Sequence, residues 1–162
     1  MPRTHTFIRT QLIRRPLEEV FAFFSDAANL EVITPPFLHF KILSPQPIPM
    51  HPGAVIDYQL RLYGVTFRWR TIIESYDPPR RFSDTQARGP YKLWHHTHEF
   101  YEVPEGVLMI DRVRYQMPYW LLGNLAHGLF VKSTLERIFD YRYEQIARLL
   151  PDELPEKVLQ TA

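Results

Sequence analysis

The sequence predicts an α+β protein in which an antiparallel sheet of about seven strands covers one long C-terminal helix. Three observations support this fold class: a single strand-like run at residues 4–14, two short helical patterns directly after it, and six further strand-like runs with short connections before a final helical pattern at 121–150. Strands joined by short turns pair antiparallel. A sheet must also bury its apolar face against another element, so we expect the final helix on the concave face of a curved sheet.

Length and composition restrict the classes of protein to consider. The chain has 162 residues, which corresponds to one domain, here placed at residues 1–150 with a tail at 151–162. Nineteen Lys and Arg residues nearly balance eighteen Asp and Glu residues, so no charge excess indicates a nucleic-acid partner. There is no cysteine, no signal-peptide pattern and no apolar run of membrane-spanning length. We therefore expect a cytoplasmic protein without integral membrane association.

The two early helices follow from their spacing and from proline. Pro16 occupies a favoured first helical position, and apolar residues then recur at helical intervals: Leu17, Val20, Phe21 and Phe24. Asp26 is suited to begin a second short helix at 27–33, which Pro35 would end.

The strand-like runs alternate apolar and polar residues. They are residues 4–14, 37–44, 55–62, 65–76, 82–88, 92–103 and 107–117. A two-residue turn between the third and fourth runs sets a register that places Tyr58 opposite Trp69 on an aromatic face. The other face then carries an opposite-charge pair, Asp57 and Arg70, which is typical of a solvated face.

The last two runs bring together the strongest candidates for chemistry. Alternation puts Trp94, His96, His98 and Phe100 on one face. The matching face of the next run holds Met109, Asp111, Val113 and Tyr115, with Asp111 opposite His98. Such a pair can simply satisfy two polar groups in an apolar pocket, or hydrogen-bond a ligand. It can also act as an oriented general base, in which case His98, Asp111 and Tyr115 are the candidate catalytic residues.

A metal site is a further interpretation of the same strand. His96, His98 and Glu102 share a face, and imidazole with carboxylate suits zinc, iron or manganese. Glu102, however, falls at the expected hairpin tip, in water. We therefore expect no tightly held metal and no cofactor.

Several segments also resemble a known superfamily. The motif-bearing segments are PLEEVFAFFSDAANLEVITPPF (16–37), GPYKLWHHTHEF (89–100), DRVRYQMP (111–118) and LERIFDYRYEQI (135–146). With the order of elements over residues 4–150, they resemble the ligand-binding branch of the SRPBCC superfamily. This is the helix-grip fold of START lipid-transfer domains, pollen-allergen-like proteins and polyketide cyclase/dehydrase-like proteins.

The resemblance implies a cavity between the sheet and the C-terminal helix. The expected function is binding of a hydrophobic or amphipathic small molecule, such as a lipid, isoprenoid or polyketide-like compound, by a carrier or sensor. A cyclase or dehydratase that uses the His–Asp pair, and an accessory interaction protein with a vestigial cavity, are the alternatives. Because the fold hosts all three classes, cavity chemistry must separate them. The candidate ligand-binding residues are Tyr58, Leu60, Phe67, Trp69, Trp94, His96, His98, Phe100, Met109, Asp111, Val113, Tyr115, Leu125 and Leu129.

Overall fold

A computed structural model describes residues 3–62, 64–117 and 125–153 of the chain. Its elements, in chain order, are β1 (Thr4–Ile13), α1 (Leu17–Ser25), α2 (Asn29–Val32), the 3-10 helix η1 (Pro36–Leu38), β2 (Lys41–Ile42), β3 (Val55–Leu62), β4 (Val65–Asp77), β5 (Arg81–Arg88), β6 (Leu93–Val103), β7 (Gly106–Gln116) and α3 (Leu125–Leu149). The predicted α+β class, with a seven-stranded antiparallel sheet and a long C-terminal helix, is confirmed.

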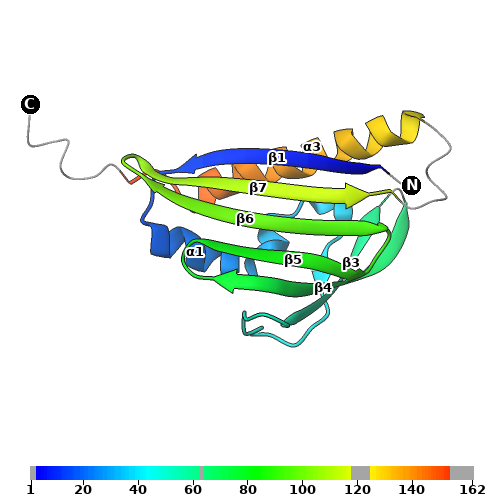
Figure 1. The fold of residues 1–162 in the computed structure, drawn as a ribbon, viewed down its shortest axis with the longest axis horizontal. Helices are drawn as coiled ribbons and strands as arrows, with labels where there is room; N and C mark the ends of the chain where they lie inside the picture. Colours follow the sequence, from blue (N-terminus) through cyan, green and yellow to red (C-terminus); the bar gives the residue numbers. More distant parts are fainter. Residues whose placement is uncertain (1–2, 63, 118–124, 154–162) are drawn as a thin grey trace, which may run out of the picture.

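The seven strands form one sheet in the order β1-β7-β6-β5-β4-β3-β2. Figure 1 shows α3 running along one face of this sheet, close to β1 and β7. Side chains join the two ends of the chain there, because Arg9 lies 2.6 Å from Asp140 and the centroids of the Phe7 and Phe139 rings are 4.9 Å apart. The C-terminal helix is therefore anchored on the N-terminal strand.

Both predicted hairpin registers are confirmed. Tyr58 pairs with Trp69 and His98 with Asp111, and Arg70 forms two 2.8 Å hydrogen bonds to the Asp57 carboxylate on the solvent side. The pairing of β4 with β5 shifts register twice, once after Arg70 and once after Ile73. Such bulges bend a strand and increase its twist, which gives the sheet the curvature needed to surround a cavity.

The expected strand at residues 37–44 is wrong in most of its length. Residues Pro36–Leu38 form η1, and only Lys41–Ile42 pair with β3. The interruption is His39, whose φ of 46° lies in the left-handed region and turns the chain between the two. A run of apolar residues here serves to cover the sheet rather than to extend it.

The candidate ligand-binding residue Leu129 does not lie on the buried face of the long helix. Leu129 is 69% exposed, whereas the side chains that α3 and the residue after it bury are Val131, Leu135, Phe139, Ile146 and Leu150. These recur at helical intervals, so they form one face of a helix. Leu129 is two residues away from this series, on another face. The predicted start of the helix, at residue 121, lies outside the described residues.

The described part of the tail contacts the N-terminal segment. The backbone N–H of Glu153 donates to the carbonyl of Arg14 at 3.3 Å, and the Glu153 carboxylate lies 2.7 Å from Arg15. Among the described helices, none has both the length and the apolar character needed to cross a membrane.

Candidate functional site

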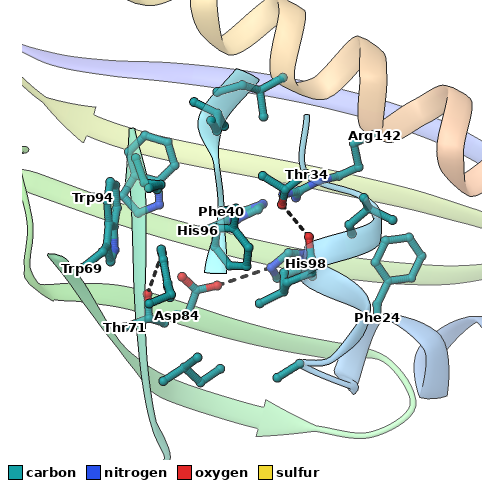
Figure 2. A pocket seen from close by; sticks show the side chains of 18 of the residues that line it. Phe24, Thr34, Phe40, Trp69, Thr71, Asp84, Trp94, His96, His98 and Arg142 are labelled. Atoms are coloured by element: carbon teal, nitrogen blue, oxygen red, sulfur yellow. Dashed lines mark hydrogen bonds and ion pairs between the residues drawn. The ribbon is translucent and has the colours of Figure 1, made fainter. Parts of the chain in front are cut away.

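A cavity of about 140 Å³ lies between the concave face of the sheet, α3 and the segment from α1 to η1. A buried water needs only about 10–15 Å³, so the space suits an organic molecule. Its apolar lining includes Leu38, Leu60, Trp69, Trp94 and Ile138. Figure 2 shows the two tryptophans at one end of the cavity, and Phe24, His98 and Arg142 toward the other.

Four polar side chains from three adjacent strands meet at the sheet wall of this cavity. Alternation along β6 places His96 and His98 on the concave face, with ring centroids 3.9 Å apart. The neighbouring strands supply Asp84, opposite His96 on β5, and Asp111, opposite His98 on β7. His96, His98 and Asp84 line the cavity itself, while Asp111 lies behind the imidazoles.

Asp111 binds both imidazoles. Its Oδ1 atom accepts a hydrogen bond from Nε2 of His96 at 2.8 Å and lies 2.9 Å from Nδ1 of His98. The second contact lacks hydrogen-bond alignment, so it is an ionic contact at close range. On the other side of His98, Nε2 lies 3.3 Å from Oδ2 of Asp84, and the Phe82 ring stacks on the imidazole at 4.2 Å.

The surroundings of these groups push their pKa values in different directions. Burial alone raises the pKa of Asp111, but the hydrogen bond from His96, the close contact with His98 and the charges of both imidazoles outweigh it and lower the pKa, so this carboxylate is ionised. Burial also acts on His98, yet the Asp111 and Asp84 carboxylates outweigh it and raise the pKa of His98. The pKa of His96 is lowered by burial and by the nearby charge of His98. Of the two imidazoles, His98 therefore keeps its second proton to higher pH than His96 does.

Two further donors of the lining lack a hydrogen-bond acceptor among the described residues. The indole N–H of Trp69 is one, on a side chain that is only 4% exposed, and the Nε atom of Arg142 is the other. The Arg142 guanidinium lies over the Phe139 ring at 4.9 Å. In contrast, the Tyr58 hydroxyl has a partner, Thr71, at 3.2 Å. Because a buried donor without an acceptor costs free energy, both unpaired donors favour a ligand that carries acceptors.

The structure brings some of the candidate ligand-binding residues to the cavity and places others elsewhere. On the lining are Tyr58, Leu60, Trp69, Trp94, His96 and His98. Away from it are Phe67, Phe100, Met109, Asp111, Val113, Tyr115 and Leu129. The side chain of Leu125 lies outside what the structure describes.

Packing explains why residues on the same sheet face differ. Phe100 and Met109 are covered by α1 in one core cluster, and Val113 and Tyr115 lie under α3 in another. Between these two clusters, His96 and His98 of β6 reach the open space, which continues over β5, β4 and β3. Alternation indicates the face of the sheet, but it does not indicate where helices cover that face.

The sequence reasoning missed several lining residues, above all Asp84 and Arg142. Alternation along β5 places Asp84 on the concave face and could have indicated it. The β5–β6 connection is too long, however, to fix the pairing register that sets Asp84 opposite His96. The acidic partner proposed from sequence, Glu102, is exposed at the hairpin end. Asp84, His96 and His98 instead each offer one ligand atom, and these atoms all lie within 4.8 Å of one another.

Comparison with solved structures supports the fold assignment. The Zhui aromatase/cyclase from Streptomyces sp. R1128 superimposes with a TM-score of 0.68 at 15% sequence identity, covering 89% of this chain and 92% of that one. The protein TTHA0849 from Thermus thermophilus gives a TM-score of 0.67 at 16% identity, over 91% and 99% of the two chains. Ara h 8.0201 gives 0.60 at 16% identity, over 90% and 99%. No protein-family model and no curated protein sequence matches the chain.

The chain therefore has the helix-grip fold that the sequence motifs indicated. At these identities the likeness concerns the fold, so the function must be argued from the cavity itself.

Proposed function

We propose that this protein binds a small amphipathic molecule in the cavity between the sheet and α3, as a carrier or sensor. The observation that carries the proposal is a largely apolar cavity that also holds two buried donors without acceptors, Trp69 and Arg142. A vestigial cavity would have no reason to keep such donors unpaired, because each costs about 1–3 kcal/mol when left without a partner.

The walls favour a compact ring system over a long acyl chain. The volume is about 140 Å³, and one end is formed by aromatic rings, with Trp69 and Trp94 edge to face at 5.4 Å. Flat ligands stack well on such rings. A polyketide-like or other cyclic compound therefore fits this end better than a lipid tail.

The opposite end favours an anionic group. No described residue forms an ion pair with Arg142, although its guanidinium lies on the lining. A carboxylate or similar anion would satisfy it with charge-assisted hydrogen bonds, which are the strong ones in proteins. The indole N–H of Trp69 would bind a neutral acceptor, such as a carbonyl, at the other end of the same ligand.

Two fluorescent probes of similar shape test this proposal. Anilinonaphthalene sulfonate carries an anionic group, whereas N-phenyl-1-naphthylamine is uncharged. We expect Arg142→Met to weaken the anionic probe at least tenfold and to leave the neutral probe within about twofold, since one lost charge-assisted bond corresponds to about 1.5–3 kcal/mol. The exposed Arg148, on the same helix, provides the control Arg148→Met.

A variant that fills the cavity separates internal from surface binding. Ile138→Trp introduces an indole from α3 into the lining and should abolish binding of both probes while the far-ultraviolet circular dichroism is unchanged. Probe binding that survives Ile138→Trp, or an equal response of both probes to Arg142→Met, would contradict the proposal.

Acid–base catalysis is the second candidate, because His98 sits on the cavity wall between two carboxylates, at 2.9 Å from Asp111 and 3.3 Å from Asp84. That arrangement orients an imidazole for proton transfer. If it operates, the protein should accelerate exchange of the α-protons of 1,3-cyclohexanedione with deuterated water, measured by NMR, and His98→Gln should remove the acceleration. Equal exchange rates with the wild type and the variant would leave binding as the function.

A further inference from the structure

We propose that Asp84, His96 and His98 bind one divalent first-row transition-metal ion at the cavity wall, with Asp111 orienting the two imidazoles. Two imidazoles and one carboxylate form a ligand set that suits zinc or iron(II). The three residues come from neighbouring positions of β5 and β6, where the paired strands hold them. A rigid sheet is a more accurate support for such a site than a loop.

The spacing of the donor atoms is close to that of a bound site. Nε2 of His98 and Oδ2 of Asp84 are 3.3 Å apart, and one atom from each of the three residues falls within 4.8 Å of the others. With metal–ligand bonds of about 2.0–2.2 Å, neighbouring ligand atoms lie roughly 3–3.5 Å apart. The atoms of His98 and Asp84 already have that separation. The His96 side chain must rotate to bring its nitrogen equally close to them.

Asp111 supplies the second carboxylate that metal-binding histidines usually have. It contacts Nε2 of His96 at 2.8 Å and Nδ1 of His98 at 2.9 Å. Each ring therefore directs one nitrogen to Asp111, and its other nitrogen remains available to a metal ion. A carboxylate in this position fixes the tautomer and the ring orientation of a metal ligand.

The contact between His98 and Asp84 is compatible with a bound cation. When the single proton of a neutral His98 is on Nδ1, beside Asp111, its Nε2 presents a lone pair to Oδ2 of Asp84. Two acceptors at 3.3 Å need a proton or a metal ion between them. The side chains of His98 and Asp84 are largely buried, at 10% and 15% exposure, so water does not easily take the place of that proton or metal ion.

The remaining coordination positions would face the cavity. His96, His98 and Asp84 all line it, and three protein ligands leave sites open on a metal that takes four or more. A ligand of the cavity would therefore reach the ion directly. The mixed nitrogen and oxygen donors disfavour magnesium and calcium, which take oxygen ligands.

The test is metal binding to the chelator-treated, full-length protein. Titration with Co²⁺ and Zn²⁺, followed by calorimetry and by the visible absorption of Co²⁺, should give one ion per chain. Asp84→Asn and His98→Gln should each weaken binding at least 100-fold, and Asp111→Asn by about 10–100-fold, as expected for an orienting partner. The exposed residues His39 and Glu102 give the controls His39→Asn and Glu102→Gln, which should leave affinity within twofold.

A measurement on the unmodified protein covers the case in which the variants fail to fold. Co²⁺ should shift the imidazole proton resonances of His96 and His98 far outside the normal NMR range, while those of His39 stay in place. Absence of one-to-one binding up to pH 8 would overturn the proposal and leave a proton between Asp84 and His98. Binding that persists in both Asp84→Asn and His98→Gln would also overturn it. Neutral-probe binding by the metal-free protein tests the proposed function separately.

Discussion

Replacing Asp111 by asparagine should be one of the most destabilising single polar changes in this protein. The carboxylate is 5% exposed and is in contact with two imidazoles, at 2.8 and 2.9 Å. Removing one partner of a buried ionic group costs about 3–5 kcal/mol, because the other charge stays buried without compensation. In Asp111→Asn the remaining charge is that of His98, and the new amide N–H₂ faces donors. We expect a loss within this range in the metal-free protein.

Urea denaturation at pH 6.5, followed by tryptophan fluorescence, measures this free energy of unfolding. A loss of about 3–5 kcal/mol should lower the melting temperature by roughly 6–20 °C for a chain of this size. Asp57→Asn is the matched control, because Asp57 also pairs with a cation across two strands but at the surface. Exposed pairs contribute about 0.2–1 kcal/mol. If the two variants lose the same free energy, burial does not govern the strength of the Asp111 contacts and the reasoning is wrong.

Three other predictions concern single residues. Gly106→Ala should destabilise the fold by about 1–3 kcal/mol, because the φ angle of Gly106 is +138° and the added Cβ would collide with the carbonyl of Ile13. A melting temperature equal to that of the wild type would refute this. Gly128→Ala should stabilise it by about 1 kcal/mol, since the position is helical and a Cβ there meets open space; calorimetry showing a lower melting temperature would count against it. In NMR titrations of the metal-free protein, His98 should titrate above, and His96 below, the usual value of about 6.5. The stabilisation from protonated His98 is then complete below pH 6.5 and is lost as the pH rises through its folded pKa, so coincident titration of both rings would contradict the assigned charges.

The parts of the fold that local chemistry determines were predictable from the sequence. A two-residue turn and a tight hairpin fix the registers that pair Tyr58 with Trp69 and His98 with Asp111. Where a connection is longer, as before β6, pairing depends on tertiary packing, and Asp84 therefore remained unassigned. The left-handed turn at His39 has no glycine or asparagine to signal it.

The candidate site was predictable only in part for a different reason. Alternation places Phe100 and His98 on the same side of β6, but one is packed in a core cluster with α1 residues and the other lines the cavity. The position of a void depends on where helices end above the sheet. That position is a property of three-dimensional packing. The same holds for the face that α3 turns to the sheet, on which Phe139 is buried while Leu129 is exposed.

The pairing of β1 with β7 has a consequence for how the protein is made. Thr4 lies beside Gln116, 112 positions later in the chain, so at a synthesis rate of about 5–20 residues per second β1 waits roughly 6–22 s for its partner. During that time its backbone groups are unpaired, and an exposed strand is a template for pairing with another chain. The charges in and around β1 are all positive up to residue 15, namely Arg3, Arg9, Arg14 and Arg15. Nascent chains on neighbouring ribosomes would therefore repel one another through the segment that stays unpaired longest.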